Sequence, residues 1–189
     1  MRTRKGHYGS MMTTDIVLDS LDRVHELIPA ILDGLDRDDV LWRPDDGSNS
    51  IGWLVWHLTR VEDDHLANLG AQDQRWHSGW STRFALPYPD DAHGYGMTAE
   101  QVAAFDVASV DLLLGYAAAV AEQSRQIVAS FTAADYEKIV DTRWNPPVTL
   151  AARLVSVMVE TAQHIGQAAY ARGLRERFVG HSSGWAGHV

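Results

Sequence analysis

The stretch at residues 150–172, LAARLVSVMVETAQHIGQAAYAR, has the spacing of one long amphipathic helix. Glu160 and His164 are four residues apart in it, so both side chains lie on the same helix face. The rest of that face is apolar and includes Val157, Met158 and Ala168. A carboxylate and an imidazole on a core-facing stripe are costly unless something compensates them, and a divalent metal ion is the simplest compensator. The stretch therefore suggests a metal site.

A third ligand can come from a second apolar stretch, IGWLVWHLTRVEDDHLANL at residues 51–69, which contains His57. Two imidazoles and one carboxylate on bundle helices match sites for zinc, iron, nickel or manganese. Three protein ligands leave coordination positions open, which is typical of catalytic rather than structural zinc. The spacing alone, however, favours a different interpretation, in which both histidines are ordinary core residues and Glu160 is half exposed.

The whole chain predicts an all-α fold, a four-helix bundle. Long helical patterns, with no convincing strand between them, cover residues 13–33, 50–70, 98–130 and 149–173. Ser50 and Thr149 are predicted N-caps, Thr98 and Gln101 form a predicted capping box, and Gly173 is the predicted end of the last helix. The third helix has a predicted break near residues 106–109.

These boundaries predict a single bundle domain at residues 11–174, with flexible termini at 1–10 and 175–189. The longest connection, residues 71–97 between the second and third helices, is rich in glycine, proline and aspartate, and also in aromatic residues. A connection of this length inside a compact domain is usually functional or disordered. Its aromatic residues favour an ordered loop that packs over another part of the molecule.

Four residues are candidates for contacts around the predicted ligands. Trp53 lies about one helical turn before His57 and is predicted to help wall the site. Asp64 shares a helix face with His57 and could orient a ligand from behind, as metal-bound histidines usually require. Gln167 could donate to a substrate, and Arg83 in the long loop could meet an anionic group. For Asp64, Gln167 and Arg83, a solvated surface role fits the sequence at least as well.

Composition limits the partners. The 189 residues carry a formal net charge of -9, which argues against nucleic acid, because phosphate binding requires a basic patch. No stretch approaches the roughly 18 consecutive apolar residues of a membrane helix, and the N-terminus lacks the apolar core of a signal peptide. We therefore expect a cytoplasmic protein that does not bind membranes. The chain has no cysteine, which excludes disulfides, thiolate ligands and a cysteine nucleophile.

Two segments, SIGWLVWHLTRVEDDHL at 50–66 and ETAQHIGQAAYARG at 160–173, resemble the DinB-like superfamily, and RFALPYPDDAHGYGMTAEQV at 83–102 looks like the middle loop of one actinobacterial branch. The resemblance implies a four-helix bundle that holds a divalent metal ion, with His57 as the first ligand and His164 as the last. Glu160 stands where many members have histidine, and the His–Glu–His set resembles the metal domain of mycothiol-dependent maleylpyruvate isomerase. The resemblance, and not the spacing, favours the metal site over ordinary core histidines.

Single-domain relatives look like thiol S-transferases, so the resemblance implies an enzyme that joins a low-molecular-weight thiol, expected to be mycothiol, to an electrophile. Zinc is the expected ion, with nickel, iron or manganese as alternatives, and it would favour the thiolate form of the thiol. Two other functions remain open. One is a stress-associated bundle that binds a metal or small ligand without turnover, and the other is a metal-dependent hydrolase with Asp64 or Glu62 as base. Relatives are often homodimers, so a homodimer is also expected.

Overall fold

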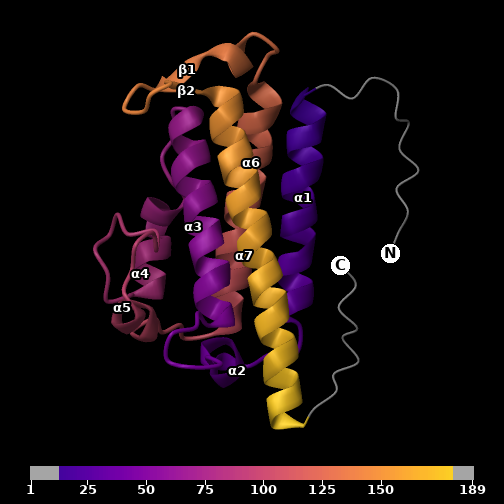
Figure 1. Cartoon of the computed structure of the whole chain (residues 1–189), viewed down its shortest axis with the longest axis vertical. Coiled ribbons are helices and arrows are strands. Elements are labelled where there is room, and N and C mark those ends of the chain that lie inside the picture. Colours follow the sequence, from indigo (N-terminus) through magenta and orange to yellow (C-terminus); the bar gives the residue numbers. More distant parts are fainter. Residues whose placement is uncertain (1–12, 181–189) are drawn as a thin grey trace, which may run out of the picture.

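The computed structural model describes residues 13–180 and is an all-α bundle of four long helices (Figure 1). These helices are α1 (Thr13–Leu32), α3 (Ile51–Leu69), α6 (Val110–Ser130) and α7 (Leu150–Val179). Both α3 and α1 pack against α6 and α7, so each long helix has two principal neighbours. The predicted four-helix bundle is confirmed. No helix between residues 13 and 180 combines the length and apolar character needed to cross a bilayer.

A long connection between α3 and α6 returns the chain to the end of the bundle where α3 began, so these two helices run in the same direction (Figure 1). This connection is ordered, and it carries three short elements: a kinked π-helical turn, η1 (Trp76–Trp80), and the helices α4 (Ser81–Phe84) and α5 (Ala99–Ala103). The connection lies beside α3 in Figure 1. The predicted break in the third helical pattern is confirmed, since α5 ends at Ala103 and α6 begins at Val110.

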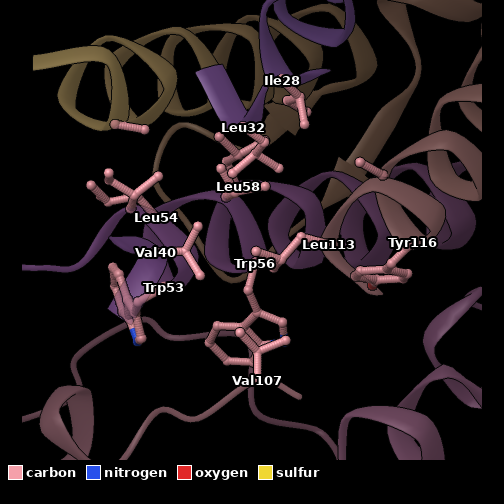
Figure 2. Packing of buried hydrophobic residues seen from close by; sticks show 14 of the residues in the cluster. Ile28, Leu32, Val40, Trp53, Leu54, Trp56, Leu58, Val107, Leu113 and Tyr116 are labelled. Carbon is pink, nitrogen blue, oxygen red and sulfur yellow. The ribbon is translucent and has the colours of Figure 1, made fainter. Parts of the chain in front are cut away.

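The helix α3 is buried on nearly all sides, because other helices cover one side and the long connection covers another. Its Trp56 is fully buried and contacts Trp76, Tyr88 and Phe105 of the connection, with ring centroids 6.2, 5.5 and 5.7 Å away. Figure 2 shows core side chains around α3, among them Leu32 of α1, Val40, Val107, and Leu113 of α6. The first part of α3, from Ile51 to Trp56, is apolar all round and is expected to be buried in this way, whereas the later part also buries charged side chains such as Arg60 and Asp63.

The predicted helix starts are confirmed. Ser50 accepts a hydrogen bond from the Trp53 backbone N–H, and Thr149 accepts one from Ala152. Thr98 and Gln101 form the reciprocal capping box at the start of α5. Each of these side chains satisfies a backbone donor that has no partner within its own helix.

Several short elements were not predicted. The helix α2 (Arg37–Leu41) lies between the first two predicted helices, with a capping box between Asp36 and Asp39. Before α7, a 3₁₀ turn, η2 (Asp135–Glu137), precedes two short antiparallel strands, β1 (Ile139–Asp141) and β2 (Val148–Thr149). Elements this short have too few residues to show a helical or strand periodicity.

The predicted end of the last helix at Gly173 is wrong, because α7 continues to Val179. Tertiary contacts hold this extension: Arg175 Nε donates to Asp39 Oδ1 at 2.9 Å, and Arg172 is bound to the end of α1. The segment predicted to be flexible from residue 175 is therefore helical as far as Val179. The predicted flexible residues 1–10 and 181–189 lie outside the described part of the chain.

Replacing Arg172 by leucine is expected to lower the free energy of unfolding by about 2–4 kcal/mol. Arg172 is only 3% exposed, and its Nη1 donates to the carbonyl oxygens of Ala30 and Ile31, while Nε donates to Glu176. Leucine has no donor for the Glu176 carboxylate or for the two carbonyls, which lie at the end of α1, where carbonyl groups lack partners within the helix. Urea unfolding measures the change, and the exposed Arg23→Leu variant is a control expected to change little. An Arg172→Leu protein as stable as the parent would contradict the prediction.

Candidate metal centre

Three side chains from two helices meet on one side of α3. His57 comes from α3, and Glu160 and His164 come from α7, which packs directly against it. The possible ligand atoms of the three all lie within 4.8 Å of one another. The same Glu160 Oε1 is 3.4 Å from His57 Nε2 and 3.2 Å from His164 Nε2. No other set of three such side chains within residues 13–180 comes as close together.

The second ring nitrogen of each histidine is held by a carbonyl acceptor. His57 Nδ1 donates to the backbone carbonyl of His93, and His164 Nδ1 donates to Gln167 Oε1 at 2.8 Å. Because a carbonyl acceptor at Nδ1 requires the proton there, Nε2 is the unprotonated nitrogen of each ring in its neutral form. This tautomer is the one that can bind a metal ion through Nε2.

A carboxylate oxygen and two neutral imidazole nitrogens are all acceptors, so atoms this close together need a proton or a cation between them. Ligand atoms about 2.0–2.1 Å from a tetrahedral zinc ion are about 3.3–3.4 Å apart. The two measured contacts of Glu160 Oε1, at 3.2 and 3.4 Å, match that spacing. The donor set and these two distances therefore fit a divalent metal ion, with the ligand nitrogens of the two histidines no more than 4.8 Å apart.

The site is buried at one end and open at the other. The His57 side chain is 4% exposed, whereas those of His164 and Glu160 are 15% and 35% exposed. Burial lowers the pKa of His57, which favours the neutral imidazole that a metal ion binds. Glu160 and His164 therefore lie at the solvent-facing end of the site.

Two contacts fix the ring of His57. The Trp53 ring stacks on it with centroids 4.7 Å apart and an interplanar angle of 20°. The Gly94 backbone lies against it so closely that a Cβ atom there would be 3.0 Å from His57 Cγ and 3.1 Å from Trp53 Cζ2. Trp53 thus lies beside the predicted ligand, and Gln167 contacts His164, as described above.

The other two candidates lie elsewhere. Asp64 is not the acceptor that orients His57: it accepts from Gln74 Nε2 at 2.8 Å and lies 3.2 Å from His65 Nδ1. Seven residues place Asp64 about 10 Å along α3 from His57, so a shared helix face does not bring the groups together. Arg83 is exposed and its guanidinium lies 4.0 Å over the Trp80 ring, with no described hydrogen bond or ion pair to the three ligands.

Neither of the two carboxylates suggested as the base of a hydrolase lies at this site. Glu62 is 1% exposed and holds His25 Nε2 at 2.9 and 3.0 Å through its two carboxylate oxygens. Asp64 is engaged by Gln74 and His65. Neither carboxylate contacts the three ligands in the described part of the chain, so neither is placed to act as a base there.

The acceptor that the sequence analysis missed is the backbone carbonyl of His93. This carbonyl belongs to the long connection. The pattern of side chains in a sequence does not predict which backbone carbonyl of a loop will face the His57 ring on α3. The only local signal is Gly94 beside it, whose φ of 100° is a conformation that favours glycine.

The model of the family described as Mycothiol-S-transferase matches residues 16–177. The chain belongs to this family. The family is DinB-like, so the resemblance seen in the sequence is confirmed, and the match spans the elements that carry His57, Glu160 and His164. No curated protein is a significant match to the chain.

A solved structure supports the fold. It is described as the crystal structure of the conserved protein of locus from Enterococcus faecalis, and it is 31% identical in sequence with a TM-score of 0.81. The alignment covers 87% of this chain and 98% of the other. This member of the mycothiol S-transferase family therefore shares its fold with a protein whose description names no activity.

Proposed function

We propose that this protein is a metal-dependent thiol S-transferase that joins mycothiol to an electrophile, with His57, Glu160 and His164 as the metal ligands. The observation that carries the proposal is the convergence of three ligand atoms, with both histidines held at Nδ1 and the Glu160 side open to solvent. Membership of the mycothiol S-transferase family supports the choice of reaction and of thiol.

Two imidazole nitrogens and one carboxylate oxygen suit zinc best, and nickel, iron or manganese also accept such ligands. A bound divalent cation lowers the pKa of a coordinating thiol, so that the reactive thiolate is available near neutral pH. The chain contains no cysteine, so the sulfur nucleophile has to arrive with a cosubstrate.

The chain's own groups have separate tasks. His57 is fixed by Trp53, Gly94 and the His93 carbonyl, and so provides a rigid donor. Glu160 contributes the one negative charge of the donor set, from a side chain that is one-third exposed. With an alkyl bromide as electrophile, a carbon–sulfur bond forms, the carbon–bromine bond breaks, bromide leaves with the electron pair, and the thiol proton passes to solvent.

The test combines metal analysis with product formation. Protein purified without chelators is analysed by elemental mass spectrometry and then incubated with mycothiol and an alkyl bromide, with thioether quantified by liquid chromatography and mass spectrometry. We expect about one ion per chain and thioether formation faster than without protein. Glutathione and free cysteine in place of mycothiol test the choice of thiol. A stoichiometric metal ion without acceleration for any thiol would overturn the transferase and favour the non-catalytic metal-binding bundle.

A further inference from the structure

We propose that Arg60 is a positioning residue for the metal ligand His57, acting through the backbone segment 92–94 of the long connection. The inference rests on the proposed metal site, but it concerns a residue outside the donor set. Arg60 lies three residues after His57 on α3, so the two side chains are neighbours on the surface of the helix.

The two side chains hold consecutive carbonyls of the same segment. Arg60 Nε donates to the Ala92 carbonyl at 3.2 Å, and His57 Nδ1 donates to the carbonyl of the next residue, His93. The acceptor for His57 is backbone, so its position depends on what holds the segment and not on the side chain at residue 93. Arg60 is the side chain on α3 that binds this segment directly before the acceptor.

Arg60 is itself fixed by a buried ion pair and a hydrogen bond. Its side chain is fully buried, and Nη1 lies 3.7 Å from Asp63 Oδ2 and donates to Gln74 Oε1 at 2.9 Å. Asp63 also accepts from the Tyr116 hydroxyl at 2.8 Å. Burial raises the pKa of Tyr116, which keeps this hydroxyl protonated as a donor. The guanidinium therefore has a fixed position relative to both α3 and α6.

The same cluster holds the beginning of the connection. Asp63 accepts from the backbone N–H groups of Arg75 and Trp76 at 2.9 and 2.8 Å. The Trp76 ring lies under the Arg60 guanidinium, and its Nε1 donates to the Asp90 carbonyl at 2.8 Å. The chain that leaves α3 and the chain that returns at 90–92 are thus both held by this cluster, close to His57.

The chemistry of the side chain matters as much as its charge. A guanidinium has several donors in a fixed fork, so Arg60 can hold the Ala92 carbonyl and Gln74 together, whereas a lysine ammonium is a compact point charge on a flexible stem. Buried ion pairs are often no more stabilising than apolar packing, which makes a role in fixing geometry the better explanation for this one.

The test compares Arg60→Lys with Arg172→Lys, a matched loss of a buried guanidinium that also binds backbone carbonyls. Zinc affinity is measured by competition with a chromophoric chelator, and the visible spectrum of the Co²⁺ form reports ligand geometry. We expect Arg60→Lys to weaken zinc binding by about 10–100-fold, the usual effect of losing an outer partner of a metal ligand, and to change the Co²⁺ spectrum. Arg172→Lys is expected to lower the melting temperature and leave both readouts unchanged.

A second variant covers the case in which Arg60→Lys does not fold. The double variant Arg60→Met/Asp63→Asn leaves no unpaired buried charge, and asparagine Oδ1 can still accept from one of the two backbone N–H groups that bind the separate oxygens of Asp63. It is expected to show the same loss of zinc affinity in a folded protein. A folded Arg60 variant with parental zinc affinity and Co²⁺ spectrum would overturn the inference. Failure of the parent protein to bind zinc would instead overturn the proposed function.

Discussion

Replacing His164 by alanine is expected to abolish stoichiometric zinc binding and, with it, thiol transfer. Loss of an outer partner already weakens metal sites by about 10–100-fold, so loss of a ligand is expected to exceed about 100-fold. Metal content, zinc affinity and thioether formation measure the effect. His164 suits the test because its side chain is 15% exposed at the edge of the core, so alanine there leaves a smaller packing defect than at His57.

Thermal stability gives a second readout that does not depend on activity. Zinc at about 100 times its Kd should stabilise the parent by about 2.7 kcal/mol, which corresponds to a rise of about 5–10 °C in Tm for a chain of this size. The His164→Ala protein should show no such rise. The control is His65→Ala, which removes an imidazole of α3 that pairs with Asp64 and not with the ligands. Equal zinc binding by His164→Ala and the parent would mean that the three residues are ordinary core and surface side chains.

The placement of Glu160 and His164 on one face of α7 could be predicted because it depends only on helix geometry. A separation of four residues puts Glu160 and His164 on one face of any helix, whatever packs against that helix. That His57 faces the same point depends on how α3 and α7 pack, which periodicity does not encode. The resemblance to a known superfamily supplied that link, and the structure brings the three residues together.

The features of the site and of the fold that could not be predicted from the sequence depend on contacts between distant segments. Asp64 was a reasonable candidate to orient His57 because it shares a helix face, but two turns of α3 separate the two side chains. The acceptor is instead a backbone carbonyl, at His93, in a connection without periodicity. Likewise, Gly173 is a plausible helix end from local preference alone, yet Arg172 and Arg175 bind the end of α1 and Asp39, and α7 continues.

The Gly94→Ala substitution is expected to weaken zinc binding by at least about 10–100-fold, by displacing the His93 carbonyl from His57. A Cβ atom at residue 94 would collide with His57 Nδ1 and lie 3.0 Å from His57 Cγ and 3.1 Å from Trp53 Cζ2. The ring is stacked on Trp53, so either the imidazole or the segment has to move. Zinc competition and the Co²⁺ spectrum measure the change.

The matched control for this substitution is Gly96→Ala. Gly96 has a φ of 72°, so alanine there also carries the strain of a positive φ, about 1–3 kcal/mol, but no atom lies within 4 Å of the added Cβ. Both variants therefore carry backbone strain, whereas only Gly94→Ala places an atom against the His57 ring. If the two variants lost zinc affinity equally, loop strain and not contact with His57 would be the cause. If neither lost affinity, the segment 92–94 would not position the ligand at all.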